Sequence, residues 1–104
     1  MFIFRARGFP ASGKAAEYHA ATEEWVKKAH AQGYIVSLAR QYFGAEGESC
    51  FTVTIKFKDL AEFERALHQI EASADYRAYG SKVTGLTRAA PRYELLEVLV
   101  PFPR

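Results

Sequence analysis

Apolar and polar residues alternate at the start of the chain and predict a β-strand over residues 2–9. Pro10 interrupts this pattern, and residues 14–32 then carry apolar side chains at helical spacing on one stripe. The members of that stripe are Tyr18, Ala21, Trp25, Val26 and Ala29. Gly33 suits the position that follows a helix C-terminus. The first third of the chain is therefore expected to form a strand and then an amphipathic helix.

Two further runs of apolar residues predict strands over residues 34–43 and 49–57. The segment between them, residues 44–47, reads Gly-Ala-Glu-Gly and is typical of a compact turn. Because strands joined by so short a loop pair with each other, we expect an antiparallel hairpin.

A second helix is expected from Leu60 onward, because Asp59 and Glu62 occupy the N-cap and third positions of a capping-box-like start. Its apolar stripe consists of Phe63, Leu67 and Ile70. Residues 74–83 could form a further short helical piece, interrupted at Gly80.

The last part of the chain predicts a loop over residues 84–92 and a closing strand over residues 93–100, which Pro101 and Pro103 terminate. Two helices and four strands in the order β-α-β-β-α-β fit a four-stranded antiparallel sheet with both helices on one face. We therefore expect a ferredoxin-like α+β fold. Since no linker or repeat interrupts the chain, residues 1–104 are expected to form one domain.

The strands carry apolar residues on both of their faces, which is unusual for a sheet covered on one side. In the closing strand, Tyr93, Leu95 and Leu99 point one way, and Leu96, Val98 and Val100 point the other way. The helices can cover only one face, so an identical subunit is the expected cover of the other. The sequence therefore predicts a homodimer through the sheet face. A monomer that tolerates surface apolar residues is the alternative.

The composition is that of a globular protein, with 49% hydrophobic and 25% charged residues. The net charge is +2 and the basic residues form no tract, so no nucleic-acid partner is expected. No apolar run approaches the roughly 20 residues that cross a bilayer, so no membrane association is expected. The N-terminus shows no signal-peptide pattern, and Cys50 is the only cysteine, which together favour a cytoplasmic location.

Three segments carry a resemblance to a known family: residues 57–66, residues 74–79 with two tyrosines, and residues 93–96. With the predicted element order, the chain resembles the dimeric α/β-barrel superfamily, and within it the NIPSNAP-like group. The resemblance implies a dimer of face-to-face sheets, with a pocket between sheet and helices in each subunit. It does not imply one activity, because the superfamily includes monooxygenases, isomerases and haem-handling enzymes.

The sequence contains no asparagine, which separates it from several relatives of that fold. The haem-degrading and quinone-forming monooxygenases of the superfamily resemble each other in using an asparagine near the substrate, commonly with a tryptophan. Trp25 is the only tryptophan of this chain, and His68 is the residue most similar to a haem-ligand histidine. Acylphosphatases share the strand order but also use an asparagine. RNA-recognition domains carry a basic-Gly-aromatic signature that residues 50–55 lack.

Residues 8–15 match the phosphate-loop pattern up to its lysine, between a predicted strand and a predicted helix. The hydroxyl residue that would bind magnesium is replaced by Ala15, and Arg5 and Arg7 alternate in a strand that such a loop requires to be buried. We therefore interpret the segment as a strand-to-helix turn.

The histidines His19 and His30 lie too far apart along one helix to share a metal ion, so no metal site is expected. No cofactor is expected either.

Aromatic and arginine side chains are the candidates for ligand contact. Aromatic residues on the helices and strands could line an apolar pocket or simply form the core. The arginines could hold an anionic group or could pair with Glu94 or Glu97. The candidate ligand-binding residues are Arg5, Arg7, Tyr18, Trp25, Arg40, Tyr42, Phe63 and His68.

Three functions fit these observations. The first is a NIPSNAP-like homodimer that binds a small aromatic or hydrophobic ligand in the cleft between sheet and helices. The second is a cofactor-independent monooxygenase or isomerase that acts on an aromatic or polyketide-like substrate, with tyrosine and arginine side chains in polarisation or proton transfer. The third is an interaction module, which a closed and fully packed cleft would favour.

Overall fold

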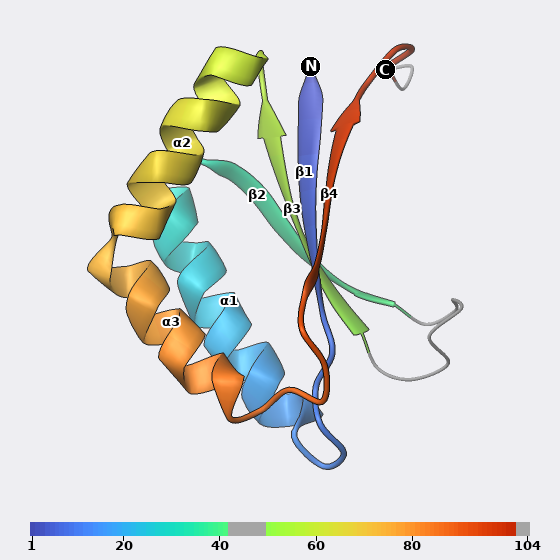
Figure 1. Ribbon diagram of the computed structural model, residues 1–104, viewed down its shortest axis with the longest axis vertical. Helices are drawn as coiled ribbons and strands as arrows, with labels where there is room; N and C mark the ends of the chain where they lie inside the picture. The colour runs from blue at the N-terminus through green and yellow to red at the C-terminus, as the bar shows by residue number, and fades with distance from the viewer. Residues whose placement is uncertain (42–49, 102–104) are drawn as a thin grey trace.

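The computed structural model describes residues 1–41 and 50–101 and shows an antiparallel four-stranded sheet with three helices on one of its faces (Figure 1). This arrangement confirms the predicted ferredoxin-like α+β fold. The elements in chain order are β1 (Phe2–Gly8), α1 (Ala15–Ala31), β2 (Ile35–Gln41), β3 (Cys50–Phe57), α2 (Leu60–Ala72), α3 (Ala74–Thr84) and β4 (Arg92–Glu97). The predicted turn at residues 44–47 lies outside the described residues.

The strand order across the sheet is β2-β3-β1-β4, and every neighbouring pair is antiparallel. The first strand, β1, is therefore central, with β3 on one side and β4 on the other. We call the face that meets the helices the inner face and the opposite one the outer face. On β1, the inner face carries Phe4, Ala6 and Gly8, because side chains alternate along a strand and Phe4 packs against Phe63 of α2.

The helix ends follow the local sequence signals. Asp59 accepts a hydrogen bond from the Glu62 N–H at 2.8 Å, and the Glu62 carboxylate in turn accepts one from the Lys58 N–H at 2.8 Å. The capping signal at the start of α2 is thus confirmed. Gly33 follows α1 with a φ of 93°, a left-handed conformation that favours glycine.

Two predicted boundaries are wrong. Helix α3 continues through Gly80, because Ser73 caps it with a hydrogen bond from the Tyr76 N–H and its packing against α1 outweighs the cost of one glycine. Strand β4 ends at Glu97, not at residue 100. One hydrogen bond to β1's side of the sheet continues past this end, from the Val98 N–H to the Met1 carbonyl.

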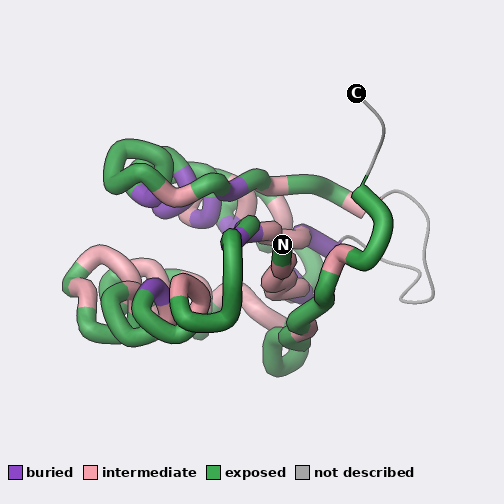
Figure 2. The backbone as a smooth tube through the Cα atoms, turned by 90° about the horizontal axis from the view of Figure 1, so that it is seen from above, coloured by how far each residue is buried: buried purple, intermediate pink, exposed green. Residues whose placement is uncertain are grey.

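The core lies between the sheet and the helices, as the buried segments in Figure 2 show. Helix α1 supplies three of its members, and β2, β3 and α2 supply the others. The fully packed cluster consists of Trp25, Val26, Ala29, Val36, Ile55, Phe57 and Ala66. The predicted α1 stripe therefore faces the core, as its spacing indicates.

The outer face is more polar than the sequence pattern predicts. Strand register arranges it in three rows across the sheet. One row is apolar except for its lysine, and the other two are polar or charged except for one alanine. The rows are Ile35, Lys56, Ile3, Leu96, then Ser37, Thr54, Arg5, Glu94, then Ala39, Thr52, Arg7, Arg92. The expectation of a sheet that is apolar on both faces is therefore correct for one end of the outer face only.

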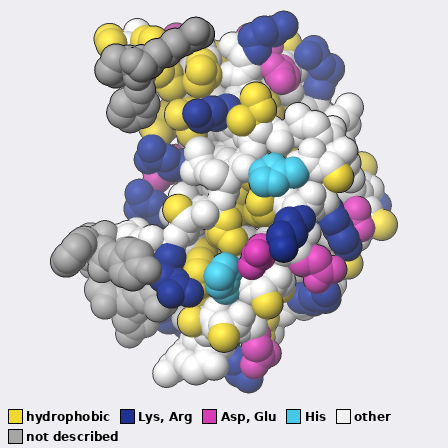
Figure 3. All heavy atoms as spheres, turned by 180° about the vertical axis from the view of Figure 1, so that it is seen from behind, with side chains coloured by type: hydrophobic (Ala, Val, Ile, Leu, Met, Phe, Trp, Pro, Cys, Tyr) yellow, Lys and Arg dark blue, Asp and Glu magenta, His cyan; other side chains and the backbone are white. Residues whose placement is uncertain are grey.

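Charged side chains of both signs are mixed over the surface on the helical side of the view from behind (Figure 3). This distribution agrees with the absence of a basic tract from the sequence. Within residues 1–41 and 50–101, none of the helices combines the length and hydropathy needed to cross a bilayer.

Candidate ligand-binding site

A cavity of about 580 Å³ lies between the inner face of the sheet and the helices. A volume of this size fits a small organic molecule. The strands contribute the floor and α2 and α3 contribute most of the opposite wall. Its aromatic lining consists of Phe4, Tyr18, Trp25, Phe57, Phe63, Tyr76, Tyr79 and Tyr93. The cleft between sheet and helices is thus open and not fully packed.

Ring contacts hold the aromatic wall in place. The Trp25 ring stacks on Tyr79 with centroids 5.7 Å apart and meets Tyr76 edge-on at 5.8 Å. On the other side, Phe4 lies 5.7 Å from the rings of both Phe63 and Tyr93. Since α3 carries two of these rings, it forms a wall of the cavity as well as a cover of the core.

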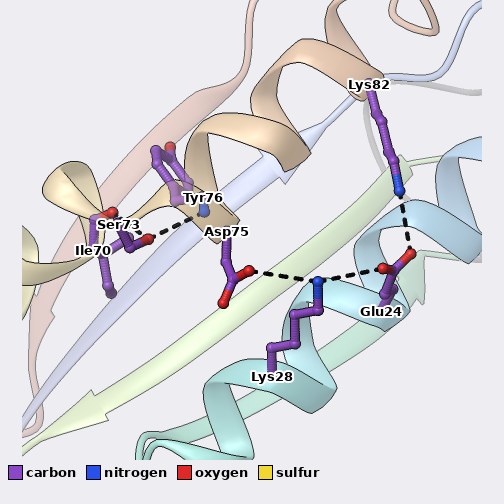
Figure 4. Close-up of polar contacts among 7 residues, drawn as sticks. All are labelled: Glu24, Lys28, Ile70, Ser73, Asp75, Tyr76 and Lys82. Atoms are coloured by element: carbon purple, nitrogen blue, oxygen red, sulfur yellow. Dashed lines mark hydrogen bonds and ion pairs between the residues drawn. The ribbon is translucent and has the colours of Figure 1, made fainter.

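Ion pairs fasten α3 to α1 on the outside of that wall (Figure 4). Lys28 lies 3.4 Å from Glu24 and 3.5 Å from Asp75, and Lys82 lies 3.3 Å from Glu24. Hydrogen bonds from Lys82 and Lys28 lower the pKa of the Glu24 carboxyl. All of these groups are exposed, so each pair contributes little to stability, but together they fix the position of α3 on α1.

Tyr18 marks one end of the cavity. It is 6% exposed, and its hydroxyl lies directly over Gly8, where a Cβ atom would come within 1.6 Å of the phenol oxygen. Residue 8 is therefore glycine because the Tyr18 ring occupies the space of a side chain. Both residues line the cavity, so the Tyr18 hydroxyl borders it at the end of β1.

A short hydrogen-bond chain lies beside that hydroxyl. Thr22 donates its only proton to the Tyr18 carbonyl oxygen at 2.8 Å. The Thr22 oxygen is also 3.1 Å from the Tyr79 hydroxyl, which must therefore be the donor in this second bond. The proton of Tyr79 is thus directed at Thr22, and its oxygen offers only lone pairs to the cavity.

The phenols of Tyr18 and Tyr76 keep their protons at neutral pH. Burial raises the pKa of Tyr18 well above its usual range, and the neighbouring Tyr79 raises it further. Burial, and to a lesser extent the neighbouring Tyr93, raise the pKa of Tyr76 to about 12. These two residues therefore present neutral hydroxyl groups to the cavity and not phenolates.

Half of the sequence-predicted site residues meet in this cavity. Tyr18, Trp25 and Phe63 line it, and Arg7 borders it from a position of β1 whose side chain belongs to the outer face. Arg7 also pairs with Glu94 at 3.4 Å, which confirms the ion-pair interpretation of this arginine.

The other predicted residues lie elsewhere. Arg5 points to the outer face, and His68 is exposed on α2 and does not line the cavity. Arg40 covers the Phe51 ring at 5.3 Å, in a shallow hollow beside His19. Tyr42 lies outside the described residues. A ligand role for these four residues stays a prediction.

Three tyrosines of the cavity were not among the sequence-predicted residues. Tyr76 and Tyr79 stand one helical turn apart on α3, a spacing that places both on one face. This spacing was the available signal, but only the packing of α3 on Trp25 shows that the face is buried. Tyr93 is 57% exposed and lies at the rim of the cavity. Alternation along β4 indicates which face of the sheet it occupies, but not that this face borders a cavity.

No cluster of three or more histidine, cysteine, aspartate or glutamate side chains within the described residues is arranged to hold a metal ion. The phosphate-loop-like segment forms a turn, with Gly13 at a φ of 77°. The turn interpretation of that segment agrees with this conformation.

Replacing Gly8 with alanine should displace the Tyr18 ring and destabilise the fold by about 1–3 kcal/mol, because the new methyl group occupies the position of the phenol. Urea unfolding measures the change. Gly80→Ala is the matched control, because its Cβ meets nothing within 4 Å and alanine favours a helix, so stability should rise by roughly 0.5–1 kcal/mol. Equal stability of the Gly8→Ala variant and the unmodified protein would contradict the assigned position of Tyr18.

Alkaline pH should destabilise the protein through Tyr76. Its pKa is raised from 10.0 to about 12 by folding, so the stabilisation is complete below pH 10 and is lost as the pH rises through 12. Urea unfolding of a Tyr76→Phe variant should show a smaller loss over this window. Tyr34→Phe, which removes an exposed hydroxyl bonded to Gln69, is the control. An unchanged pH dependence in the Tyr76→Phe variant speaks against the buried phenol.

Comparison with known proteins gives matches in structure only. No protein-family model matches the chain, and no curated protein matches its sequence. An uncharacterised NIPSNAP domain protein from Burkholderia xenovorans is similar with a TM-score of 0.80 and 11% identity, over 100% of both chains. A candidate antibiotic biosynthesis monooxygenase from Caulobacter crescentus CB15 has a TM-score of 0.76 and 18% identity, over 95% of this chain and 90% of that one.

A third similar structure is a mutant of SnoaB, a cofactor-independent oxygenase from Streptomyces nogalater. Its TM-score is 0.70 at 16% identity, over 99% of this chain and 97% of that one. At such low identities the likeness concerns the fold and not the activity. The chain thus has the fold of the antibiotic biosynthesis monooxygenase-like and NIPSNAP domain proteins, as the sequence resemblance indicates.

Proposed function

We propose that this chain is a NIPSNAP-like homodimeric protein that binds a small aromatic or hydrophobic compound in the cavity between sheet and helices. The observation that carries this proposal is the cavity itself, about 580 Å³ in volume and lined mainly by aromatic and aliphatic side chains. Apolar walls with a few placed hydroxyl groups are typical of small-molecule sites. Stacking on Trp25 and Phe4 would hold a flat ring.

Binding is better supported than catalysis. A general acid or base works best with a pKa near the working pH, and within the described residues no histidine, cysteine or lysine lines the cavity. The phenols of Tyr18 and Tyr76 hold their protons too tightly to act as bases at neutral pH, and Arg7 is paired with Glu94. The alternative, a cofactor-independent monooxygenase or isomerase acting on an aromatic or polyketide-like substrate, rests on the fold of proteins such as SnoaB.

The proposed dimer joins two copies through their outer sheet faces. The apolar row on that face supports it, because Ile3 and Leu96 lie side by side and Ile35 is 67% exposed at the other edge. Beyond β4, Leu99 and Val100 are 82% and 86% exposed. A two-fold axis would bring two such apolar ends into one interface.

Titration of the protein with acetylnaphthalene tests the binding function. Trp25 is the only tryptophan and lines the cavity, so its emission should change in a saturable way, with half-saturation at roughly micromolar concentrations. A free tryptophan derivative, titrated in parallel, corrects for absorption by the probe. An emission change no larger than that of the free derivative would argue against ligand binding in the cavity. Turnover of a polyphenol by the unmodified protein, lost on mutation of a cavity tyrosine, would favour the enzyme alternative.

A further inference from the structure

A glycine lies in the interior of helix α3, on the face that lines the cavity. Four cavity-lining residues of this helix fall at spacings of three and four and therefore share one stripe. They are Tyr76, Gly80, Val83 and Thr84. Apart from proline, glycine is the least favourable residue in a helix interior, because it loses the most conformational freedom on folding. The helix alone would therefore favour alanine or a larger residue at position 80.

Packing within the protein does not account for this glycine. Among the described residues, the glycines with a positive φ are Gly13 and Gly33, so Gly80 has an ordinary helical backbone. A Cβ atom at Gly80 would meet nothing within 4 Å beyond the adjacent backbone of its own helix. Gly8 differs, because its missing side chain makes room for the Tyr18 ring. The space beside Gly80 is thus not taken up by another part of the described chain.

That space belongs to the cavity. Along the stripe, Tyr76 comes one helical turn before Gly80 and Thr84 one turn after it, so the missing side chain leaves a notch in the α3 wall. The Gly80 carbonyl oxygen accepts a hydrogen bond from the Thr84 hydroxyl at 2.7 Å. The notch therefore presents the Cα atom of Gly80 to the cavity as an apolar contact surface.

We infer that the ligand is a rigid, flat ring compound that packs directly on the helix backbone at Gly80. Close approach of a ligand to the backbone is a situation that favours glycine, because any other residue would place a Cβ atom in between. A flexible chain can bend around one methyl group, whereas a fused ring cannot. Gly80 thus determines specificity for rigid rings, and the inference rests on the proposed function because it names the ligand class of the same cavity.

The variant Gly80→Ala tests this contact with acetylnaphthalene in calorimetry. The affinity should fall about tenfold because the new methyl group overpacks the notch, although urea unfolding should show a more stable protein. Gly85→Ala is the matched control, since its Cβ also meets nothing within 4 Å but it follows α3 and does not line the cavity. Its affinity should equal that of the unmodified protein. Equal affinities of the Gly80→Ala and Gly85→Ala variants would overturn the contact at Gly80.

A flexible ketone, decan-2-one, tests the ligand class with the same variants. Its affinity should change less than about twofold in Gly80→Ala, because the chain can bend around the added methyl group. A loss as large as that of acetylnaphthalene would overturn the selection of rigid rings. Failure of acetylnaphthalene to bind the unmodified protein would instead overturn the proposed function itself.

Discussion

Replacing Ala6 with tryptophan should weaken the binding of acetylnaphthalene about 100-fold or more. Ala6 lies on the inner face of the central strand β1, directly between Val53 of β3 and Tyr93 of β4. All three residues line the cavity, so a large side chain at position 6 would fill the middle of its floor. A ring ligand and an indole cannot share that space.

Calorimetry measures this loss, because a second tryptophan would complicate the emission signal. Ala20→Trp is the matched control, since Ala20 is exposed on α1 and does not line the cavity. The control should bind the probe like the unmodified protein. Equal affinity of the Ala6→Trp and Ala20→Trp variants, with both folded by circular dichroism, would place the ligand outside the cavity.

Replacing Leu96 with lysine should raise the dissociation constant of the proposed dimer on the order of 100-fold. Leu96 pairs with Ile3 in the apolar row of the outer face. In a two-fold dimer each substitution appears twice, so two charges would lose their hydration in one interface. Sedimentation of the unmodified protein at micromolar concentration should show a dimer, and the variant should show a monomer.

A leucine of similar exposure provides the control for this experiment. Leu60 is 48% exposed at the start of α2, on the helical side of the sheet. Leu60→Lys should leave the dimer intact. If the unmodified protein sediments as a monomer, the dimer proposal fails, whereas the cavity, which lies within one subunit, is unaffected.

The element order could be predicted from the sequence because its signals are local. Alternation over residues 2–9, the stripe around Trp25 and the cap at Asp59 each depend on neighbours a few residues away. The same holds for Gly33, whose conformation follows from the end of its own helix. The ferredoxin-like fold and the resemblance at the level of the fold followed from these signals.

The contribution of α3 to the cavity wall could not be predicted in this way. Tyr76 and Tyr79 line the cavity only because α3 packs against Trp25 of α1, a contact between distant parts of the chain. The spacing of the two tyrosines shows only that they share one face of α3, not that this face borders a cavity. Tyr18 and Trp25 of α1, two of the candidates named from the sequence, line the cavity, and their role in ligand binding stays a prediction.

The polarity of the outer face also required the strand register. Alternation shows which residues of one strand share a face, but not which rows they form with the other strands. Only the register places Thr54 between Ser37 and Arg5 in a polar row, and Ile3 beside Leu96 in the apolar row. Strands that each carry apolar residues on both faces can therefore form a sheet whose outer face is mostly polar.

A crystal structure of the protein with acetylnaphthalene tests the central claim most directly. We expect the ring between the inner face of the sheet and the helices, in contact with Trp25. A probe bound on the outer face or elsewhere on the surface, with the cavity free of it, would contradict the account.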